Sequence, residues 1–387
     1  MSPLLGHRLY LCQGVDILPD GVNYRRFVPN ESIQYYPLCD DFGPMNLSSV
    51  VQFIRQLDDE LKMYPECVLL YSVELGERAL TNGVFLLGAF MILHLKASMS
   101  EVKKSFSGLA PSLVTTYRDA TFSHPDFGLT LEDCWRGIVK GMELGWIRAP
   151  SSIDNYEWGC MDVDEYAHYD DPINGDMHEV VPGKFLAFKG PADLGAHYYQ
   201  DDPCGYRTFG PAYYADVFED YKVTAVVRLN EPRYDGQLFV ERGMEFHELE
   251  FEDCTAPPPA VVEAFLRVAD AAAGAVAVHC KAGLGRTGTL IAVYLMRRHG
   301  FTAREAMGWL RIMRPGSVIG EQQHYLCAAG ADPSRAPPRA RGAAADREES
   351  SALAAEVAAG MKRRGSLRAR GGAGSAAACA RPSGCAE

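Results

Sequence analysis

The residues best able to do chemistry form one short segment: His279-Cys280-Lys281-Ala282-Gly283-Leu284-Gly285-Arg286-Thr287. Its two glycines let the backbone curl so that successive N–H groups point inward and form an anion nest. The Arg286 guanidinium can bind two phosphate oxygens in parallel. That positive field, together with the start of a helix near Arg286, favours the thiolate of Cys280, which is the nucleophilic form. The segment therefore predicts attack by Cys280 on a bound phosphate group. Thr287 is expected to hydrogen-bond the sulfur, and His279 to orient the loop.

A cysteine and an arginine five residues apart occur often by chance. The whole segment, lying between a predicted strand and a predicted helix, is far more specific. A thiolate nucleophile also needs a proton donor for the leaving oxygen, and Asp253 is the candidate. Asp253 follows a predicted strand at 246–251, in a loop that ends in a run of prolines and could act as a mobile flap. The alternative is a merely solvated loop aspartate. The neighbouring Cys254 is expected to be inert.

The covalent phosphocysteine must then be hydrolysed, which requires a group that positions water. Gln322 and Gln323, after the turn at 314–320, are the candidates. The sequence has no Walker A pattern, and a phosphocysteine route needs no magnesium. The expectation is therefore an enzyme without a metal or another cofactor.

Two parts of the chain have the same order of elements. In the later part, a strand at 275–278 is followed by the glycine-rich loop, a helix at 289–297 and a capping-box pattern at 302–305. In the earlier part, a strand at 67–70 is followed by a loop, a helix at 79–95 and a second capping-box pattern at 98–101.

Aligning Arg78 with Arg286 places Ser72 on Cys280. We interpret this as a degenerate internal duplication whose first copy is inactive, because it lacks the thiol and Glu74 and Glu77 would repel phosphate. The alternative is that such units recur in any α/β protein.

Charge is unevenly distributed along the 387 residues, whose net charge is -12. Residues 1–330 carry about -16 and residues 331–387 about +4. An acidic body argues against nucleic acid or an anionic membrane as the main partner, and favours a partner that carries Lys or Arg. The eleven cysteines are scattered without a CxxC pair, which indicates reduced thiols in an intracellular protein. No secretory signal is visible, and the apolar run at 83–93 is too short to span a bilayer.

The composition predicts two globular regions, 1–178 and 179–330, followed by a disordered tail at 331–387 that is rich in Ala, Gly, Arg, Ser and Pro. Within the tail, basic residues at 362–368 surround Ser366. They suggest a nuclear-import signal or a site for a basic-directed kinase, although a plain basic tail would have the same composition.

Residues 277–326 resemble the dual-specificity phosphatases of the "cell division cycle fourteen" family, as do the segments at 41–61, 163–176, 181–191 and 223–230. The resemblance implies an α/β fold of two tandem dual-specificity-phosphatase-like domains, each a central sheet flanked by helices, of which only the second is catalytic. By this likeness Cys280 is the nucleophile, Arg286 the phosphate-binding arginine and Asp253 the general acid. Gln322 and Gln323 match the family's glutamine pair.

The resemblance also implies the substrates: proteins that carry phosphoserine, or phosphothreonine, followed by proline and then a basic residue, as well as phosphotyrosine. Such sites are targets of proline-directed kinases. In the family an acidic groove receives the basic residue, and its matching positions here are Asp119, Asp170 and Asp176. One family carboxylate is replaced by Ala167, and Cys254 stands where the family usually has glycine. The implied location is the nucleus and cytoplasm, with the centrosome or spindle as further sites.

Two other functions stay open at this point. A phosphoinositide phosphatase of the tensin-homologue type would carry a second lysine where this chain has Leu284. A catalytically idle phosphopeptide-binding module would not need Asp253 or the glutamine pair.

Overall fold

The computed structural model describes residues 2–4, 8–14, 21, 23–121, 125–150, 157–195, 197–203 and 205–331. The first half of the chain forms a four-stranded sheet in the order β1–β2–β4–β3, with β1 antiparallel to β2 and the other pairs parallel. Its elements are β1 (Ser2–Leu4), β2 (Leu9–Gln13), β3 (Tyr24–Phe27), α1 (Leu47–Met63), β4 (Val68–Val73), α2 (Glu77–Leu93), α3 (Met99–Ser105), the 3₁₀ helix η1 (Pro111–Leu113), α4 (Leu131–Glu143), β5 (Glu157–Trp158), β6 (Met161–Asp162) and α5 (Val163–Asp170).

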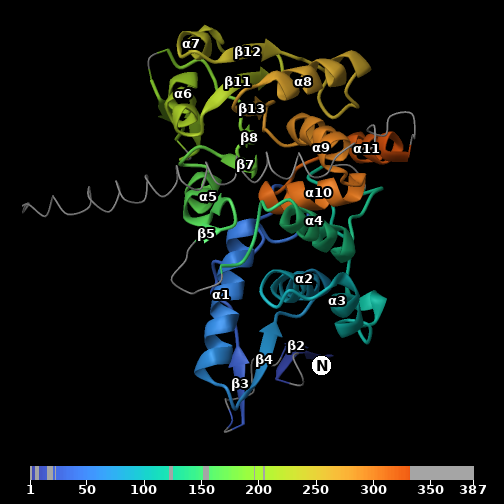
Figure 1. The fold of residues 1–387 in the computed structure, drawn as a ribbon. Helices are drawn as coiled ribbons and strands as arrows, with labels where there is room; N and C mark the ends of the chain where they lie inside the picture. Colours follow the sequence, from blue (N-terminus) through green and yellow to red (C-terminus); the bar gives the residue numbers. More distant parts are fainter. Residues whose placement is uncertain are drawn as a thin grey trace, which may run out of the picture. The chain divides into compact units, whose positions relative to one another are not determined.

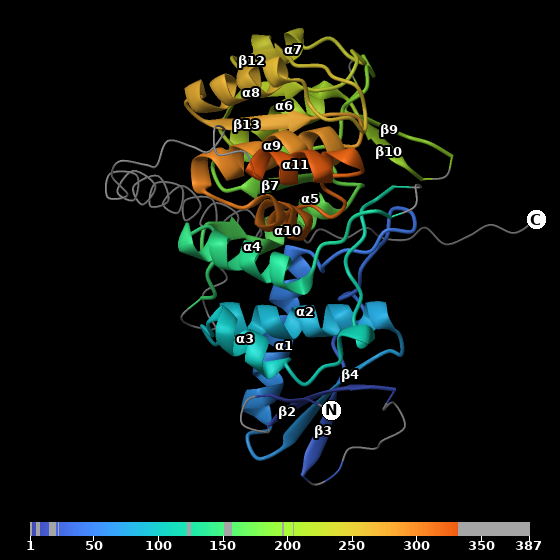
Figure 2. The ribbon, with the colours of Figure 1, turned by 90° about the vertical axis from the view of Figure 1, so that its right-hand side faces the viewer.

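The second half forms a five-stranded sheet in the order β12–β11–β13–β8–β7 (Figures 1 and 2). Its first four strands are parallel, and β7 pairs antiparallel with β8 at one edge. The elements are β7 (Met177–Val181), β8 (Phe185–Phe188), β9 (Tyr199–Asp201), β10 (Arg207–Phe209), α6 (Pro211–Asp220), β11 (Val223–Arg228), α7 (Gln237–Glu241), β12 (Glu245–Glu248), α8 (Pro259–Ala271), β13 (Ala275–His279), α9 (Gly285–His299), α10 (Ala303–Met313) and α11 (Glu321–Ala331).

Side chains on β13 alternate between the two faces of this sheet, as the pleat of a strand requires. Val276 and Val278 belong to the large hydrophobic core that also contains residues of α8, α9 and α10. Ala275 and Ala277 belong to a second cluster with residues of α6 and α7. The sheet is therefore covered on both faces, as expected for a mostly parallel sheet.

Helices α4 and α10, from the two halves of the chain, cross at very short range (Figure 2). A Cβ atom added to Gly137 would lie 2.7 Å from the backbone nitrogen of Trp309, and one added to Gly308 would lie 2.7 Å from the carbonyl oxygen of Asp133. A Cβ atom added to Gly141 of α4 would lie 2.3 Å from the Trp309 ring. The two halves thus share one continuous core.

Most predicted elements are confirmed. The predicted helices at 79–95 and 289–297 lie within or close to α2 and α9, and the capping boxes Ser98–Glu101 and Thr302–Glu305 open α3 and α10. The strand predicted at 246–251 is wrong at its C-terminal end. It is the edge strand β12 and ends at Glu248, although the Leu249 and Phe251 amides still donate hydrogen bonds to the Arg228 and Leu229 carbonyls.

The α/β fold class is also confirmed, since both sheets pack against helices. The predicted domain boundary at 178 falls inside β7, the first strand of the second sheet. Ala331 is the last residue of α11, and the predicted disordered tail from 332 on, Ser366 included, lies outside the described residues. Among the described helices none is both long and apolar enough to cross a bilayer.

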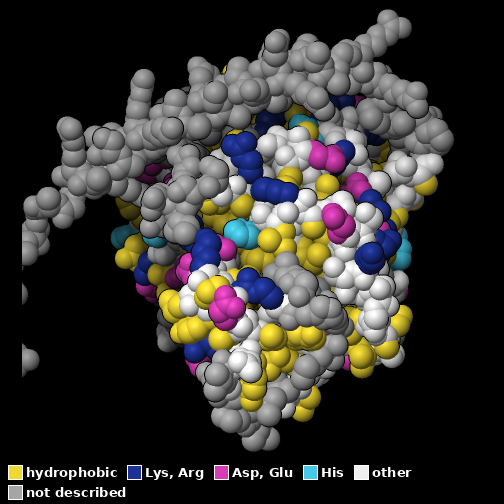
Figure 3. All heavy atoms as spheres, turned by 60° about the horizontal axis from the view of Figure 1, so that its bottom comes forward, with side chains coloured by type: hydrophobic (Ala, Val, Ile, Leu, Met, Phe, Trp, Pro, Cys, Tyr) yellow, Lys and Arg dark blue, Asp and Glu magenta, His cyan; other side chains and the backbone are white. Residues whose placement is uncertain are grey.

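One face of the molecule carries charges of both signs (Figure 3). Among the residues drawn in colour, Lys and Arg side chains alternate on this face with Asp and Glu side chains, and hydrophobic side chains lie between them.

Candidate active site

The loop between β13 and α9 places Cys280 at the middle of the second sheet's C-terminal edge. Strand β13 lies between two parallel neighbours, and α/β sheets commonly bind ligands where such strands end. The Cys280 side chain is only 3% exposed. Gly283 has a φ of 70°, and a Cβ there would lie 2.0 Å from the Phe188 carbonyl oxygen. This tight turn therefore requires glycine.

The four carbonyl oxygens of residues 280–283 are each held by a donor. The bonds run from His279 Nδ1 to Cys280 (2.9 Å), from the Gly190 amide to Lys281 (3.2 Å), from Arg314 Nη2 to Ala282 (2.9 Å) and from Arg314 Nε to Gly283 (2.8 Å). In a planar trans peptide, each N–H points away from the preceding carbonyl oxygen. The amides of residues 281–284 therefore point away from these donors and can form an anion nest.

The His279 ring is fully buried and bonded at both nitrogens. Because the Cys280 carbonyl only accepts, Nδ1 carries the proton, and Nε2 accepts from the Tyr234 hydroxyl at 2.7 Å. Burial, assisted by the charges of Arg228 and Arg286, lowers the pKa of His279 to about 3. A neutral, doubly bonded imidazole fits an orienting role and cannot readily exchange protons with substrate.

Arg286 lies at the start of α9 with its side chain buried and hydrogen-bonded to the segments that follow β11 and β12. Its Nη1 donates to the Phe251 carbonyl at 3.0 Å. Its Nε has no hydrogen-bond partner of good geometry among the described residues, nor does the buried Thr287 hydroxyl. Such unsatisfied donors beside the nest are what a phosphate-binding site requires before its ligand is bound.

Asp253 lies on the loop after β12, 52% exposed, with Oδ1 3.2 Å from the Nε atom of Arg286. The same oxygen accepts from the Cys254 amide at 3.0 Å. Cys254 adopts a φ of 60°, a left-handed conformation that favours glycine. Partial burial and the charges of Asp253, Cys280 and Asp119 raise the pKa of the Cys254 thiol. The structure thus brings the predicted acid to the predicted phosphate-binding arginine.

The two glutamines have different surroundings. Gln322 donates to the Thr255 carbonyl at 3.2 Å, and its Oε1 lies 3.0 Å from where a Cβ of Gly285 would be. Gln322 therefore connects the acid-bearing loop with the start of α9. Gln323 instead accepts from Arg311 at 2.8 Å and donates to the Gly320 carbonyl at 3.3 Å, so its amide is occupied within the protein interior.

A cavity of about 740 Å³ lies beside the loop. Asp170 and Asp176, two of the three predicted groove residues, line it, and so does Ala167. The other walls include Tyr35, Tyr36 and Leu38 from the first half of the chain and Lys189, Tyr206, Ala282 and Leu284 from the second. Asp119 does not line this cavity: its side chain is buried and accepts from the Gly320 amide at 2.7 Å.

Sequence reasoning missed Arg314 and Gly190, which hold three of the four loop carbonyls. A Cβ on Gly190 would lie 2.3 Å from the Cys280 carbonyl oxygen, so this contact needs glycine. Arg314 is read from the sequence as part of a turn, and no local pattern shows that its side chain reaches back to residues 282 and 283. Among the described residues there is no cluster of three or more His, Cys, Asp or Glu side chains able to hold a metal ion.

Two family models match the chain. Residues 3–141 match "Dual specificity protein phosphatase, N-terminal half", and residues 223–330 match "Dual specificity phosphatase, catalytic domain". Among solved structures, the active form of Tk-PTP shares 27% identity, covering 40% of this chain and 94% of its own, with a TM-score of 0.30.

Individual relatives match over most of this chain. The human dual specificity protein phosphatase CDC14A is 40% identical over 308 residues, which is 79% of this chain and 49% of the relative. The Caenorhabditis elegans tyrosine-protein phosphatase cdc-14 is 36% identical over 339 residues, 84% of this chain and 46% of the relative. The chain thus spans about half the length of these relatives.

Proposed function

Because the chain belongs to the family of the CDC14 dual specificity phosphatases, we propose that it hydrolyses phosphoserine, phosphothreonine and phosphotyrosine in proteins through a phosphocysteine intermediate. One observation carries the proposal. The buried Cys280 begins a loop whose carbonyl oxygens are all held by donors, and Arg286, at the end of that loop, has its Nε 3.2 Å from the Asp253 carboxylate.

In the first step the Cys280 thiolate attacks phosphorus and the bond to the leaving oxygen breaks. The Arg286 guanidinium and the amides of residues 281–284 stabilise the charge on the three equatorial oxygens. Asp253, on its exposed loop, gives its proton to the leaving oxygen. The products are a thiophosphate ester on Cys280 and a free hydroxyl on the substrate.

In the second step water attacks the phosphocysteine, and the sulfur leaves as a thiolate. Asp253, now ionised, accepts a proton from that water. Gln322 is the better placed of the two glutamines to orient it, since it contacts the acid-bearing loop. The Thr287 hydroxyl, buried without a protein partner among the described residues, is suited to hydrogen-bond the departing sulfur.

For the substrate we propose a phosphorylated protein segment that lies in the cavity lined by Asp170 and Asp176. Their side chains are about one-third exposed, so both can meet a Lys or Arg that follows the phosphorylated residue. Proline-directed sites with a downstream basic residue are the preferred class. Localisation to the nucleus and cytoplasm stays a prediction.

Turnover of p-nitrophenyl phosphate and of a phosphoserine-proline peptide with a basic residue three positions on tests the proposal. We expect both to be hydrolysed without added metal, and an inositol phospholipid headgroup to be a poor substrate because Leu284 stands in place of a second lysine. Oxyanion binding without any turnover would instead favour a phosphopeptide-binding module.

A further inference from the structure

Arg314, buried just after α10, uses its whole guanidinium in fixed contacts. Nε and Nη2 hold the loop carbonyls of Gly283 and Ala282, at 2.8 and 2.9 Å. Nη2 also lies 2.9 Å from the Asp176 carboxylate, while Nη1 donates to the Asp176 carbonyl at 3.1 Å and to His178 Nδ1 at 2.9 Å. All five N–H groups are thus directed at acceptors, a geometry that lysine cannot reproduce.

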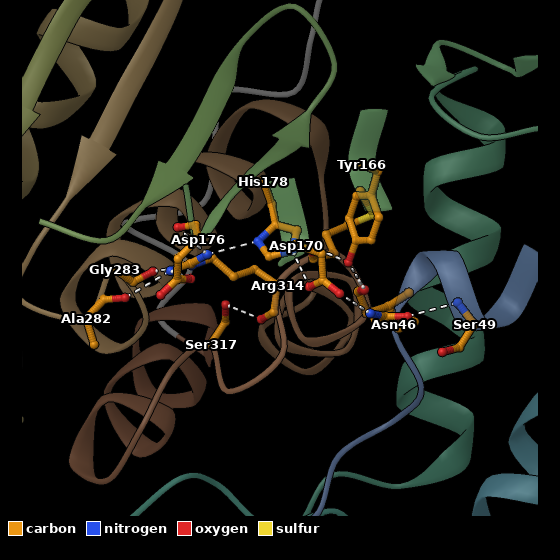
Figure 4. Close-up of polar contacts among 12 residues, drawn as sticks. Asn46, Ser49, Tyr166, Asp170, Asp176, His178, Ala282, Gly283, Arg314 and Ser317 are labelled. Carbon is orange, nitrogen blue, oxygen red and sulfur yellow. Dashed lines mark hydrogen bonds and ion pairs between the residues drawn. The ribbon is translucent and has the colours of Figure 1, made fainter. Parts of the chain in front are cut away.

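From His178 the contacts continue to the first half of the chain (Figure 4). Arginine only donates, so His178 Nδ1 accepts and its Nε2 carries the proton, which it donates to Asp170 Oδ1 at 2.7 Å. The second oxygen of Asp170 accepts from the Asn46 side chain at 2.9 Å. Asn46 is the N-cap of α1, where its own oxygen accepts from the Ser49 amide.

We infer that Arg314 and His178 are positioning residues for the phosphate loop, and that Asp170 and Asp176 serve this loop as well as the substrate groove. The same two carboxylates that line the cavity hold the Arg314 guanidinium, one directly and one through His178. The guanidinium fixes the carbonyls whose planar peptides direct the amides of Gly283 and Leu284. This assignment rests on the proposed function, because it takes residues 280–286 as the reacting site.

A small substrate can distinguish a carboxylate that positions the loop from one that only binds peptide. Aryl phosphates are too small to reach the groove, so a carboxylate that only binds the basic residue of a peptide would not affect their turnover. If the carboxylates also hold the loop, Asp176→Asn and Asp170→Asn should weaken both aryl phosphate hydrolysis and the binding of a simple oxyanion. Asparagine tolerates the φ of 48° at position 176, so Asp176→Asn removes charge with little backbone strain.

The test measures kcat/KM for p-nitrophenyl phosphate and the inhibition constant of tungstate, a phosphate mimic, in the full chain. Arg314→Lys should raise the tungstate constant about tenfold, as expected for lost hydrogen bonds to an anion cradle, and lower kcat/KM by about 10- to 100-fold through misplaced amides. His178→Gln keeps an amide near Nε2 but not near Nδ1, whereas His178→Asn does the reverse. His178→Gln should therefore lower kcat/KM about three- to tenfold relative to wild type. His178→Asn should lower it less.

His94→Gln is the matched control, because His94 also contacts a carboxylate, Asp58, at 3.2 Å, but in the first half of the chain and away from the loop. It should leave both constants unchanged. Thermal unfolding identifies any variant that fails to fold. If Arg314→Lys fails to fold, the His178 and Asp170 variants test the inference in its place. Folded variants whose tungstate constant and kcat/KM stay within about twofold of wild type would overturn the inference. A wild-type chain that neither binds tungstate nor turns over would overturn the proposed function instead.

Discussion

The two strand–loop–helix units, β4–α2 and β13–α9, share their order of elements but differ in the loop. Residues 74–76 separate β4 from α2, whereas residues 280–284 separate β13 from α9. Ser72, the counterpart of Cys280, consequently lies inside β4 and pairs with Cys12 across the sheet. Arg78 and Arg286 are each the second residue of their helix, yet Arg78 is 52% exposed and bonded to Asp40, while Arg286 is buried.

This comparison shows that a nucleophile and an arginine do not make a phosphate site. The loop must be long enough to curl, and its carbonyls must be held on the outer side so that its amides face the ligand. In the second unit His279, Gly190 and Arg314 provide those contacts. The shorter first loop leaves no room for such a nest.

The largest expected effect is at the nucleophile. Cys280→Ser should lower turnover on the order of 10⁴-fold or more while tungstate still binds, because the amide cradle remains. The comparison predicts that Ser72→Cys in that background restores nothing, since the new thiol would lie within a strand. Steady-state assays with both variants measure this, and residual activity within tenfold of wild type in Cys280→Ser alone would show that another group is the nucleophile.

The paired arginines should differ almost as much. Arg286→Ala removes the bidentate contact to the transferred phosphoryl group and should lower kcat/KM by about 10³-fold. Arg78→Ala removes an exposed ion pair with Asp40 and a cation–π contact 5.5 Å from the centre of the Phe42 ring, and should change stability by about 1 kcal/mol. Kinetics and chemical unfolding on the two variants distinguish the roles, and equal kinetic losses would mean that both units take part in catalysis.

Asp253→Asn should slow the hydrolysis of phosphoserine peptides by about 10²–10⁴-fold, the usual contribution of a general acid. The loss should be smaller for p-nitrophenyl phosphate, whose leaving group needs no proton. Glu74→Gln, on the loop of the first unit, is the control and should leave the hydrolysis of both substrates unchanged. Equal losses of Asp253→Asn on both substrates would indicate a structural aspartate.

Selectivity for a basic residue should be a smaller effect. Each partly exposed contact contributes about 0.2–1 kcal/mol, so a lysine-bearing peptide should exceed its alanine analogue by roughly tenfold in kcat/KM. The ratio should fall as salt rises. Asp170→Asn together with Asp176→Asn should bring it close to one, even though both peptides are then hydrolysed more slowly. An unchanged ratio would mean that other residues of the protein bind the basic residue of the peptide.

The last prediction concerns the pH dependence of stability rather than a reaction rate. His279 is held neutral, with its pKa lowered to about 3, whereas an unfolded histidine titrates near 6.5. The unfolded state then binds the extra proton, so this contribution to stability is complete above about pH 6.5 and is lost as pH falls toward 3. Tyr71, at the aligned position of the first unit, cannot contribute in this range. His279→Asn should therefore flatten the dependence of unfolding free energy on pH between 7 and 5, as chemical denaturation can measure.

The reacting residues could be predicted from the sequence because they are local. Cys280 through Thr287 form one continuous segment, and the capping box at Thr302 fixes the following helix by interactions within one turn. The holding contacts are not local: Gly190 and Arg314 reach the loop from about 90 and 30 residues away. Nothing in the sequence around them specifies those distances, since they depend on which strand lies beside β13 and where α10 ends.

The glycine crossing of α4 and α10 has a consequence for how the molecule unfolds. Gly137 and Gly308 let the two backbones approach so closely that not even a methyl group fits between them. Water therefore cannot enter between the halves until the two helices separate. Removing residues 1–178 would leave the Trp309 face of α10 bare, an apolar surface prone to self-association. We therefore expect one cooperative melting transition for the described residues, and a first half that lacks the phosphate loop yet is indispensable to the solubility of the second.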